Sequence, residues 1–422
     1  MNYIAQLRAF NHVQRALSYK DERLRQMQWR KLRPLVHHAY ASIPYYRQRL
    51  DAAGVAPEDL RSLADLARLP VLTKADLQAA DPQTLISRRF PRKRLAREQT
   101  SGSSGRPFVM YFDEPYRRMR KALFLRALMS CGYRPGQRLL IVTSREKRGV
   151  PAWMGWQYLS YKDPPDENVA EHNARRPRVL YGWVTPLRQM AEAARARGVT
   201  LHRPAALITT AETLDPPARR LLTEAFNCPV YEIYGLTETG TVAWQSPGWA
   251  DFRISHESMI VEFLPSPEGG PAKRLVVTNL GLRSMPFIRY DTGDLATPVT
   301  RGDGAALPAL ERVEGRLVDC VRLVDGRVVS PFELTTAMEA VPGVSRYQIL
   351  QEEGERFTVR YEPQVGVPVT PAATREAAQR AMREVMGGGI DVDVRAEVSL
   401  DPEPGRKFRV VQSQFSQQGA AG

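Results

Sequence analysis

Strand-like and helix-like segments alternate from about residue 205 of this 422-residue sequence, and this pattern constrains the fold more than any other feature. Ala206 to Ile208 form a short apolar run before a turn, Pro216 to Phe226 have helical periodicity, and Val230 to Tyr234 are again strand-like. Helices that alternate with strands cover the faces of a sheet, as in layered α/β proteins. A further strand is expected at Leu275 to Thr278, within a β-rich region of residues 251–300. The sequence therefore predicts an α/β fold of layered architecture.

A smaller unit is expected at the C-terminus. Residues Val318 to Val329 begin a new strand pattern around a turn at Asp325-Gly326, and a helix is expected near residues 372–385. We therefore predict an N-terminal domain of residues 1–316 and a small α+β domain of residues 317–422.

The first eighty residues have the pattern of helices joined by turns. A break is expected at Ser42 to Tyr46, and Thr73 is a predicted N-cap whose hydroxyl accepts a hydrogen bond from a first-turn amide. Residues 1–20 carry Arg8, Arg15 and Lys20 without an acid, as a transit peptide does. The apolar residues recur at helical spacing, however, which favours a packed amphipathic helix.

Three cysteines, Cys131, Cys228 and Cys320, lie far apart and offer neither a CxxC zinc spacing nor an evident disulfide framework. A structural zinc is therefore not expected. The sequence has no apolar run of the roughly 18 residues that a membrane span needs and no apolar core of a secretory signal. These features predict a cytoplasmic protein without a membrane partner.

The formal net charge is +14, which can attract polyanions. The densest basic run is Arg88 to Arg94, and another covers Arg145 to Arg148. Neither is interleaved with stacking aromatics, so nucleic acid is not a predicted partner. Two interpretations stay open: a solvated basic face, or attraction of ATP, a CoA-like thiol or an acidic substrate.

The segment Thr100-Ser101-Gly102-Ser103-Ser104-Gly105 has the composition of a phosphate-binding loop. Glycines let backbone amides turn towards an anion, and hydroxyls add further donors. The residues that follow, Phe108 to Phe112, are strand-like, which excludes a Walker loop because that loop leads into a helix. Taken alone, the segment fits a flexible surface turn better than a phosphate-binding loop.

Four later motifs change its interpretation. They are Tyr231 to Glu238, Arg289 to Asp294, Gly315 to Asp319 and Gly405 to Arg409. Each one alone is compatible with an ordinary turn, a buried strand end or a solvated charge cluster. All of them occur in one chain in a particular order and spacing, which favours one shared function over several unrelated turns.

Together with the Ser/Gly loop, these motifs resemble those of the adenylate-forming superfamily of acyl-CoA synthetases, peptide-synthetase adenylation domains and luciferases. The stretches His37 to Arg47 and Leu69 to Lys74 are similar to the phenylacetate-CoA ligase branch and its capsular polysaccharide biosynthesis-type relatives. The resemblance covers nearly the whole chain. It implies an ATP-dependent enzyme with a mobile C-terminal domain, which forms an acyl-adenylate and pyrophosphate and then transfers the acyl group to a thiol.

The resemblance also assigns roles to single positions. Thr100 to Gly105 would hold the β- and γ-phosphates, Ala211 and Glu212 would line the adenine pocket, and Tyr234, followed by Gly235, would lie against the ring. Thr237 would meet the α-phosphate, Glu238 the Mg²⁺, and Asp294 the ribose with Arg316 close by, while Asp319 would be the hinge. ATP, Mg²⁺ and, as co-substrate, CoA are thus the implied cofactors.

The family's C-terminal lysine is assigned to Lys407, where a cation stabilises charge on the α-phosphate during adenylation. Arg406 stands between Gly405 and that lysine, so a register with Arg406 in this role stays open. The Ser/Gly loop departs from the family pattern too, since Phe108 stands where many members have a lysine.

The acid is less well defined. Five aromatic residues are candidate walls of the acyl pocket, which would favour an aryl or arylalkyl acid, or are ordinary core residues: Trp153, Trp156, Tyr158, Trp183 and Trp244. Arg145, Lys147 and Arg148 could instead recognise an acidic substrate. Transfer to a non-CoA acceptor, a degenerate nucleotide-binding homologue and a homodimer are also left open.

Overall fold

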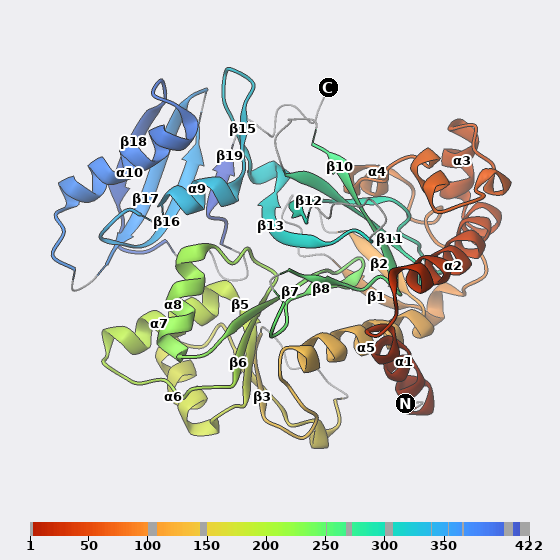
Figure 1. The fold of residues 1–422 in the computed structure, drawn as a ribbon, viewed down its shortest axis with the longest axis horizontal. Helices are drawn as coiled ribbons and strands as arrows, with labels where there is room; N and C mark the ends of the chain where they lie inside the picture. Colours follow the sequence, from red (N-terminus) through yellow and green to blue (C-terminus); the bar gives the residue numbers. More distant parts are fainter. Residues whose placement is uncertain are drawn as a thin grey trace.

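The structure is a computed structural model of the whole chain (Figure 1). The structure describes residues 3–99, 108–143, 150–249, 251–266, 272–299, 307–338, 340–352, 354–364, 367–400 and 408–413.

The N-terminal part is helical, as predicted. It contains α1 (Tyr3–Ala16), α2 (Asp21–Ser42), α3 (Pro44–Ala52), α4 (Lys74–Ala79) and the 3-10 turns η1 (Pro57–Asp59), η2 (Ala64–Arg68) and η3 (Arg92–Arg94). The break between α2 and α3 lies at Ile43, within the predicted stretch. Thr73 is the N-cap of α4: its hydroxyl accepts from the amide of Asp76 at 3.1 Å, and the Asp76 carboxylate accepts from the amide of Thr73 at 2.8 Å. This reciprocal capping box fixes where α4 begins.

A seven-stranded sheet forms the centre of the molecule, in the order β4-β3-β5-β6-β7-β8-β9. Its strands are β3 (Leu139–Thr143), β4 (Trp156–Ser160), β5 (Val179–Trp183), β6 (Ala206–Thr210), β7 (Val230–Leu236), β8 (Gly240–Trp244) and β9 (Arg253–Ile254). The five strands β3, β4, β5, β6 and β7 are parallel, and β8 and β9 are added to the sheet in antiparallel pairing.

Helices cover both faces of this sheet, which gives the predicted layered α/β architecture (Figure 1). On one face lie α6 (Pro165–Arg175), α7 (Val184–Ala196) and α8 (Pro216–Phe226), whose apolar side chains pack with Leu140, Leu180 and Leu207. On the other lies α5 (Glu114–Ser130), which packs against Ile141 and Ile208. The alternation begins at β3, earlier than the sequence pattern predicted.

An antiparallel sheet in the order β10-β11-β12-β13 packs beside the central one. Its strands are β10 (Met259–Pro265), β11 (Lys273–Asn279), β12 (Tyr290–Pro298) and β13 (Leu310–Arg316), and a separate antiparallel pair is formed by β1 (Ala96–Gln99) and β2 (Val109–Phe112). The short 3-10 turns η4 (Ala152–Met154) and η5 (Leu317–Asp319) complete the connections up to residue 319.

The residues after η5 build their own core. They form β14 (Val321–Arg322), β15 (Val328–Val329), α9 (Pro331–Met338), β16 (Val344–Gln351), β17 (Arg356–Pro363), α10 (Pro371–Met386), β18 (Asp391–Ala396) and β19 (Val411–Ser413). A sheet in the order β18-β17-β16-β19 packs with α9 and α10. Their apolar side chains form one hydrophobic cluster, whose buried members all lie between Val321 and Val411. The predicted turn at Asp325-Gly326 joins β14 to β15.

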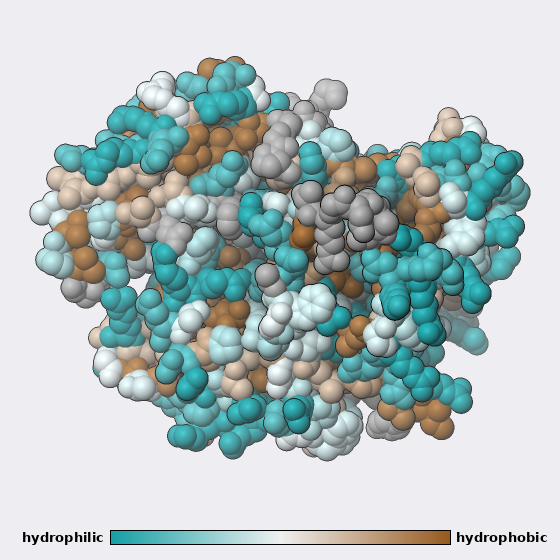
Figure 2. Space-filling view, viewed as in Figure 1, coloured by the Kyte–Doolittle hydropathy of each residue, from teal (hydrophilic) through white to brown (hydrophobic). Residues whose placement is uncertain are grey.

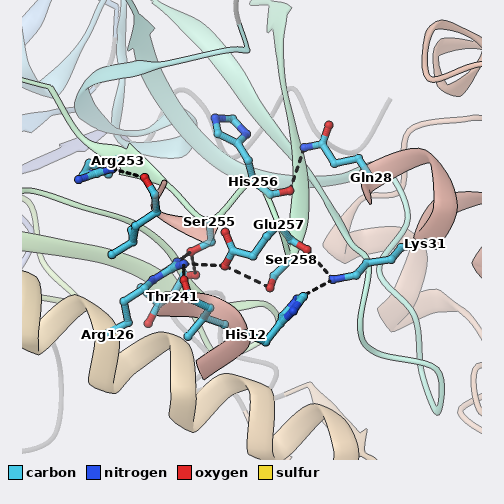
Figure 3. Close-up of polar contacts among 12 residues, drawn as sticks. His12, Gln28, Lys31, Arg126, Thr241, Arg253, Ser255, His256, Glu257 and Ser258 are labelled. Carbon is cyan, nitrogen blue, oxygen red and sulfur yellow. Dashed lines mark hydrogen bonds and ion pairs between the residues drawn. The ribbon is translucent and has the colours of Figure 1, made fainter. Parts of the chain in front are cut away.

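A buried polar cluster ties the N-terminal helices to the segment between β9 and β10 (Figure 3). Arg126 of α5 forms an ion pair with Glu257 at 2.8 Å and donates to the Ser255 hydroxyl at 3.0 Å and to the Val13 carbonyl at 2.9 Å. Lys31 of α2 donates to the Glu257 carbonyl at 2.7 Å. These contacts fix α1, α2 and α5 relative to one another, and we call them the Arg126–Glu257 cluster.

The surface is mainly polar on the face that Figure 2 shows, where hydrophobic residues occur in scattered groups. Within the described ranges, no helix has both the length and the apolar character needed to cross a membrane.

Candidate functional site

Three of the sequence motifs meet at Asp294, although they are far apart in the chain. Asp294 of β12 pairs with Arg316 of β13 in the antiparallel register, and Arg316 Nε lies 3.7 Å from Asp294 Oδ1. The Tyr234 hydroxyl of β7 donates to Asp294 Oδ2 at 2.6 Å. A carboxylate is thus fixed between an aromatic ring and a guanidinium, the arrangement expected from the resemblance for a ribose and an adenine.

The electrostatics of this group keep Tyr234 a hydrogen-bond donor. Burial, followed by the neighbouring Asp294 carboxylate, raises the pKa of Tyr234 well above its ordinary value. Burial also raises the pKa of Asp294, while Arg316 opposes that shift. An ionised Asp294 therefore depends on the cation and the hydroxyl beside it.

The turn before Asp294 explains the Asp-Thr-Gly-Asp pattern. Gly293 has a φ of +75°, and its amide donates to Asp291 Oδ1 at 3.0 Å. The amide of Asp294 donates to the Thr292 hydroxyl at 3.1 Å. The side chains of Asp291 and Thr292 thus each accept a hydrogen bond from the backbone amide two residues later and stabilise the turn. The Asp294 side chain is not needed for these turn contacts.

Glu238 lies just beyond β7 and is buried. The Tyr290 hydroxyl donates to its Oε1 at 3.3 Å, and the Tyr116 hydroxyl donates to its backbone carbonyl at 3.4 Å. Burial and the Glu238 charge together raise the pKa of Tyr290, so this tyrosine also stays a donor. The neighbouring Thr237 is partly buried.

A single buried carboxylate suits magnesium in a nucleotide site. Mg²⁺ is usually held by one or two carboxylates together with phosphate oxygens and water, and Glu238 supplies hard oxygen ligands of this kind. Within the described residues, no group of three or more His, Cys, Asp or Glu side chains could hold a metal alone. The donor set therefore fits an ion that arrives with its nucleotide.

The loop after β6 has a strained backbone. Ala211 has a φ of +68°, a left-handed conformation that a residue other than glycine rarely adopts. Such strain persists only where the surroundings impose it, and it concentrates at ligand sites. The surroundings here include Glu212, whose Oε2 accepts from the Thr185 amide at 2.7 Å. Gly235 is constrained in another way, because a Cβ there would lie 2.6 Å from the Gly240 carbonyl oxygen.

Some predicted site residues lie outside the described residues: the loop from Thr100 to Gly105, and both Arg406 and Lys407. Asp319, the predicted hinge residue, lies in η5 and accepts a hydrogen bond from Arg409. Burial raises the pKa of Asp319, and Arg409 opposes the shift.

The five aromatic candidates for the acyl pocket do not gather in one place. Trp244 is fully buried, with the Arg126 guanidinium 4.3 Å from its ring centroid, and Trp153 is 64% exposed. Trp183 stacks on Tyr161 at 5.1 Å. The remaining two, Trp156 and Tyr158, are half-buried beside α5.

The structure brings other aromatic residues to Trp156 and Tyr158. Phe124 of α5 makes edge contacts with Trp156 at 6.0 Å and Tyr181 at 5.4 Å. Strand register places Tyr158, Tyr181 and Tyr231 in one row across the sheet, through Ile141 and Ile208. Phe124, Tyr181 and Tyr231 were missed because register, which no single segment encodes, brings them together.

Comparisons with known proteins show which proteins the chain resembles. No family model matches the chain. It is 28% identical to a phenylacetate-coenzyme A ligase of Thermus thermophilus over an alignment of 431 positions, gaps included, that covers 92% of this chain and 94% of that protein. It is 24% identical to Protein CapK of Staphylococcus aureus, over 71% of this chain and 69% of that one.

Solved structures give the same fold. A 2-hydroxyisobutyryl-CoA ligase in its postadenylation state, in complex with an acyl-AMP, superposes with a TM-score of 0.77 at 21% identity, covering 95% of this chain and 92% of that one. The same ligase in its thioesterification state, with CoA bound, gives 0.60 at 22% identity and the same coverage. The sequence motifs, the site around Asp294 and these relatives all indicate that the chain is similar to the phenylacetate-CoA ligase-like branch of the adenylate-forming superfamily.

Proposed function

We propose that this protein is an AMP-forming acid–CoA ligase. It activates a carboxylic acid with ATP and then passes the acyl group to the thiol of CoA. The observation that carries the proposal is the meeting of Tyr234, Asp294 and Arg316, three residues from separate motifs, in one polar site. The phenylacetate-coenzyme A ligase of Thermus thermophilus and the 2-hydroxyisobutyryl-CoA ligase, which both align with more than 90% of this chain, support the same activity.

In the first half-reaction, an oxygen of the acid's carboxylate bonds to the α-phosphorus of ATP, and the bond to the β-phosphate oxygen breaks. The products are an acyl-adenylate and pyrophosphate. Asp294 accepts hydrogen bonds from the ribose hydroxyls, and the ring of Tyr234 lies against the adenine, which Ala211 and Glu212 enclose. These contacts position the α-phosphorus without taking part in the bond exchange.

The phosphates need compensating charge. Thr237 meets the α-phosphate and Glu238 holds Mg²⁺, which screens charge on the phosphate oxygens when it is bound. The Ser/Gly loop, Thr100 to Gly105, holds the outer phosphates through its amides and hydroxyls. Lys407 stabilises the negative charge that builds on the α-phosphate in the transition state.

In the second half-reaction, the thiol sulfur of CoA bonds to the acyl carbon and AMP leaves as its phosphate oxygen separates from that carbon. We divide the chain into residues 1–316 and a small mobile domain of residues 317–422, with Asp319 as the hinge. The separate core between Val321 and Val411 and the short η5 connection support this division. The described arrangement is nearer to the postadenylation state of the related ligase than to its thioesterification state.

We infer an aryl or arylalkyl acid as the substrate. The aromatic row of Tyr158, Tyr181 and Tyr231, with Phe124 and Trp156 beside it, lies on the α5 face of the sheet. Aromatic side chains supply a flat apolar surface and favour edge or offset contacts with another ring. We also infer a reducing cytoplasm as the location, because the three cysteines are buried and none of them forms a disulfide.

The proposal is tested by product analysis. The purified protein is incubated with ATP, Mg²⁺, CoA and a panel of aryl, arylalkyl and small hydroxy acids, and mass spectrometry follows AMP and acyl-CoA. We expect equal amounts of both products with at least one acid. AMP and a trapped hydroxamate without acyl-CoA would show that the acceptor is not CoA, and no AMP with any acid would overturn the proposal.

A further inference from the structure

Arg346 of β16 is a buried cation that lies outside the nucleotide site described above. Its side chain is 3% exposed. The pairing of β16 with β17 shifts register between Val344 and Arg346, which lie opposite Pro363 and Glu362. An extra residue in one strand bends that strand and re-aims a side chain, and such bulges are frequent beside active sites. A guanidinium placed in this way needs partners, because a buried charge without a partner is costly.

Two partners hold the Arg346 guanidinium. Its Nη1 lies 3.7 Å from Oε1 of Glu362, the residue opposite it in the strand register. Its Cζ lies 4.0 Å from the centroid of the Phe408 ring. A cation is attracted to the negative face of an aromatic ring, and the attraction is stronger where water is excluded. Arg346 therefore links a carboxylate of β17 to a residue near the C-terminus.

The same carboxylate also holds Leu400. The Leu400 amide donates to Glu362 Oε1 at 2.5 Å, and the Leu400 side chain is buried. Leu400 and Phe408 are the two residues that flank residues 401–407, which lie outside the described residues. Arg346 and Glu362, which we call the Arg346–Glu362 clamp, thus contact both ends of that segment.

The chain that follows the aromatic ring is fixed to the same strand. Gln348 Nε2 of β16 donates to the Arg409 carbonyl at 3.1 Å, and the Ile349 amide donates to the Val410 carbonyl at 2.8 Å. The Arg409 side chain donates to Asp319, the predicted hinge residue. The downstream end of the segment is therefore tied to β16 by its backbone as well as by its ring.

We propose that Arg346 is a positioning residue for the adenylation half-reaction and acts on Lys407 through Phe408. This inference rests on the proposed function, because it takes Lys407 as the cation that stabilises charge on the α-phosphate. Lys407 directly precedes Phe408, so the position of the ring limits where the lysine backbone can lie. A displacement of about 1 Å in a reacting geometry can cost about 100-fold in rate. Arg346 acts through its neighbours and does not touch the reacting atoms.

The two half-reactions separate this role from a general structural one. Pyrophosphate exchange into ATP, and thioester formation from a supplied acyl-adenylate, are measured with an acid that product analysis shows to be active, in wild type, Arg346→Met and Arg346→Lys. Arg346→Met should lower kcat for exchange about 10- to 100-fold and change KM for ATP by less than about three-fold, because the lysine acts in the transition state. Thioester formation should not change. Arg346→Lys keeps a cation beside the ring and should recover part of the loss.

Trypsin tests the position of the segment without turnover. Arg406 and Lys407 are cleavage sites within the segment, and mass spectrometry of the fragments measures how fast the folded protein is cut there. Arg346→Met should speed this cleavage about 10-fold or more, because losing a clamp contact favours local opening. Thr374→Val of α10 is the control: it removes a buried hydrogen bond to the Pro342 carbonyl at 3.0 Å and should change neither cleavage nor exchange.

Equal loss of both half-reactions in Arg346→Met would overturn the proposal, as would exchange at the wild-type rate. Unchanged trypsin cleavage in a variant that has lost exchange would also overturn it, because the segment would then have kept its position. Losses of the same size in Thr374→Val would show that destabilisation alone is responsible. A wild-type protein that exchanges no pyrophosphate with any acid would contradict the proposed function itself, whereas the cleavage rates would still show whether the clamp holds the segment.

Discussion

Two polar groupings in this molecule are both built from distant segments, but they differ in how completely their charges are paired. In the Arg126–Glu257 cluster the two side chains are 1% and 3% exposed and 2.8 Å apart (Figure 3). At the candidate site, the Arg316 and Asp294 side chains are 46% and 13% exposed and 3.7 Å apart. In the first grouping the two charges are buried and paired with each other, whereas in the second they are partly exposed and more loosely paired.

The difference indicates which cluster contributes to stability and which to binding. A buried ion pair becomes a large liability when one partner is removed, because the other charge stays buried. Replacing one member of a looser pair at the edge of a site changes the stability of the protein little, but it removes contacts to a bound ligand.

Arg126→Met should have the largest effect on stability. It leaves Glu257 buried without its partner, which typically destabilises a protein by about 3 to 5 kcal/mol. The free energy of unfolding from denaturant titration measures this change. Adding Glu257→Gln should recover part of the loss, and additive losses in the double variant would show that the two charges are not coupled.

Asp294→Asn should weaken binding while changing stability little. The neutral side chain loses charge-assisted bonds to the ribose hydroxyls, so adenosine binding should fall about 10-fold or more. Calorimetry with adenosine isolates this effect from the phosphates. Unfolding free energy should change by about 1 kcal/mol or less, and a loss as large as that of Arg126→Met would erase the contrast between the two clusters.

Lys31→Met tests the closed cluster through pH. Burial lowers the pKa of Lys31 below 10.5 in the folded protein, so the unfolded chain binds more protons between the folded pKa and 10.5. The Lys31 contribution to stability should therefore rise with pH across that alkaline window. Lys31→Met should flatten the rise and change stability by only about 1 kcal/mol at neutral pH, because the lost bond to the Glu257 carbonyl is offset by relief of a buried charge. An unchanged slope would contradict the assigned burial.

Tyr234→Phe should have the smallest effect. It removes one hydrogen bond to Asp294 and keeps the ring, so the unfolding free energy should fall by about 0.5 to 1 kcal/mol. Adenosine affinity should stay within about three-fold of wild type, since the ring contact remains. Loss of binding comparable to Asp294→Asn would mean that the hydroxyl, and not the ring, is what the site uses.

The nucleotide half of the site was predictable from sequence because its residues lie in short contiguous motifs. Asp294, Tyr234 and Arg316 each follow a recognisable strand or turn, and the structure brings them together. Thr73 was predicted as an N-cap for a local reason too. Local patterns therefore indicated residues that lie together in the structure, and their nucleotide-binding roles stay predictions.

The acid half was not predictable, since it depends on strand register and helix packing. Trp244 is a candidate pocket residue in the sequence, but the structure encloses it in the core. Phe124 and Tyr181 are in contact only because α5 packs against the face of the sheet that carries Tyr181. β4 and β5, with α6 and α7, were also missed.

The most direct test of the central claim is acid-dependent exchange of labelled pyrophosphate into ATP, measured in wild type and Asp294→Asn. The account predicts exchange with at least one carboxylic acid in the wild type, and a loss of about 10-fold or more at sub-saturating ATP in the folded variant. No exchange with any acid, or equal exchange in both proteins, would contradict the assignment of this site to adenylation.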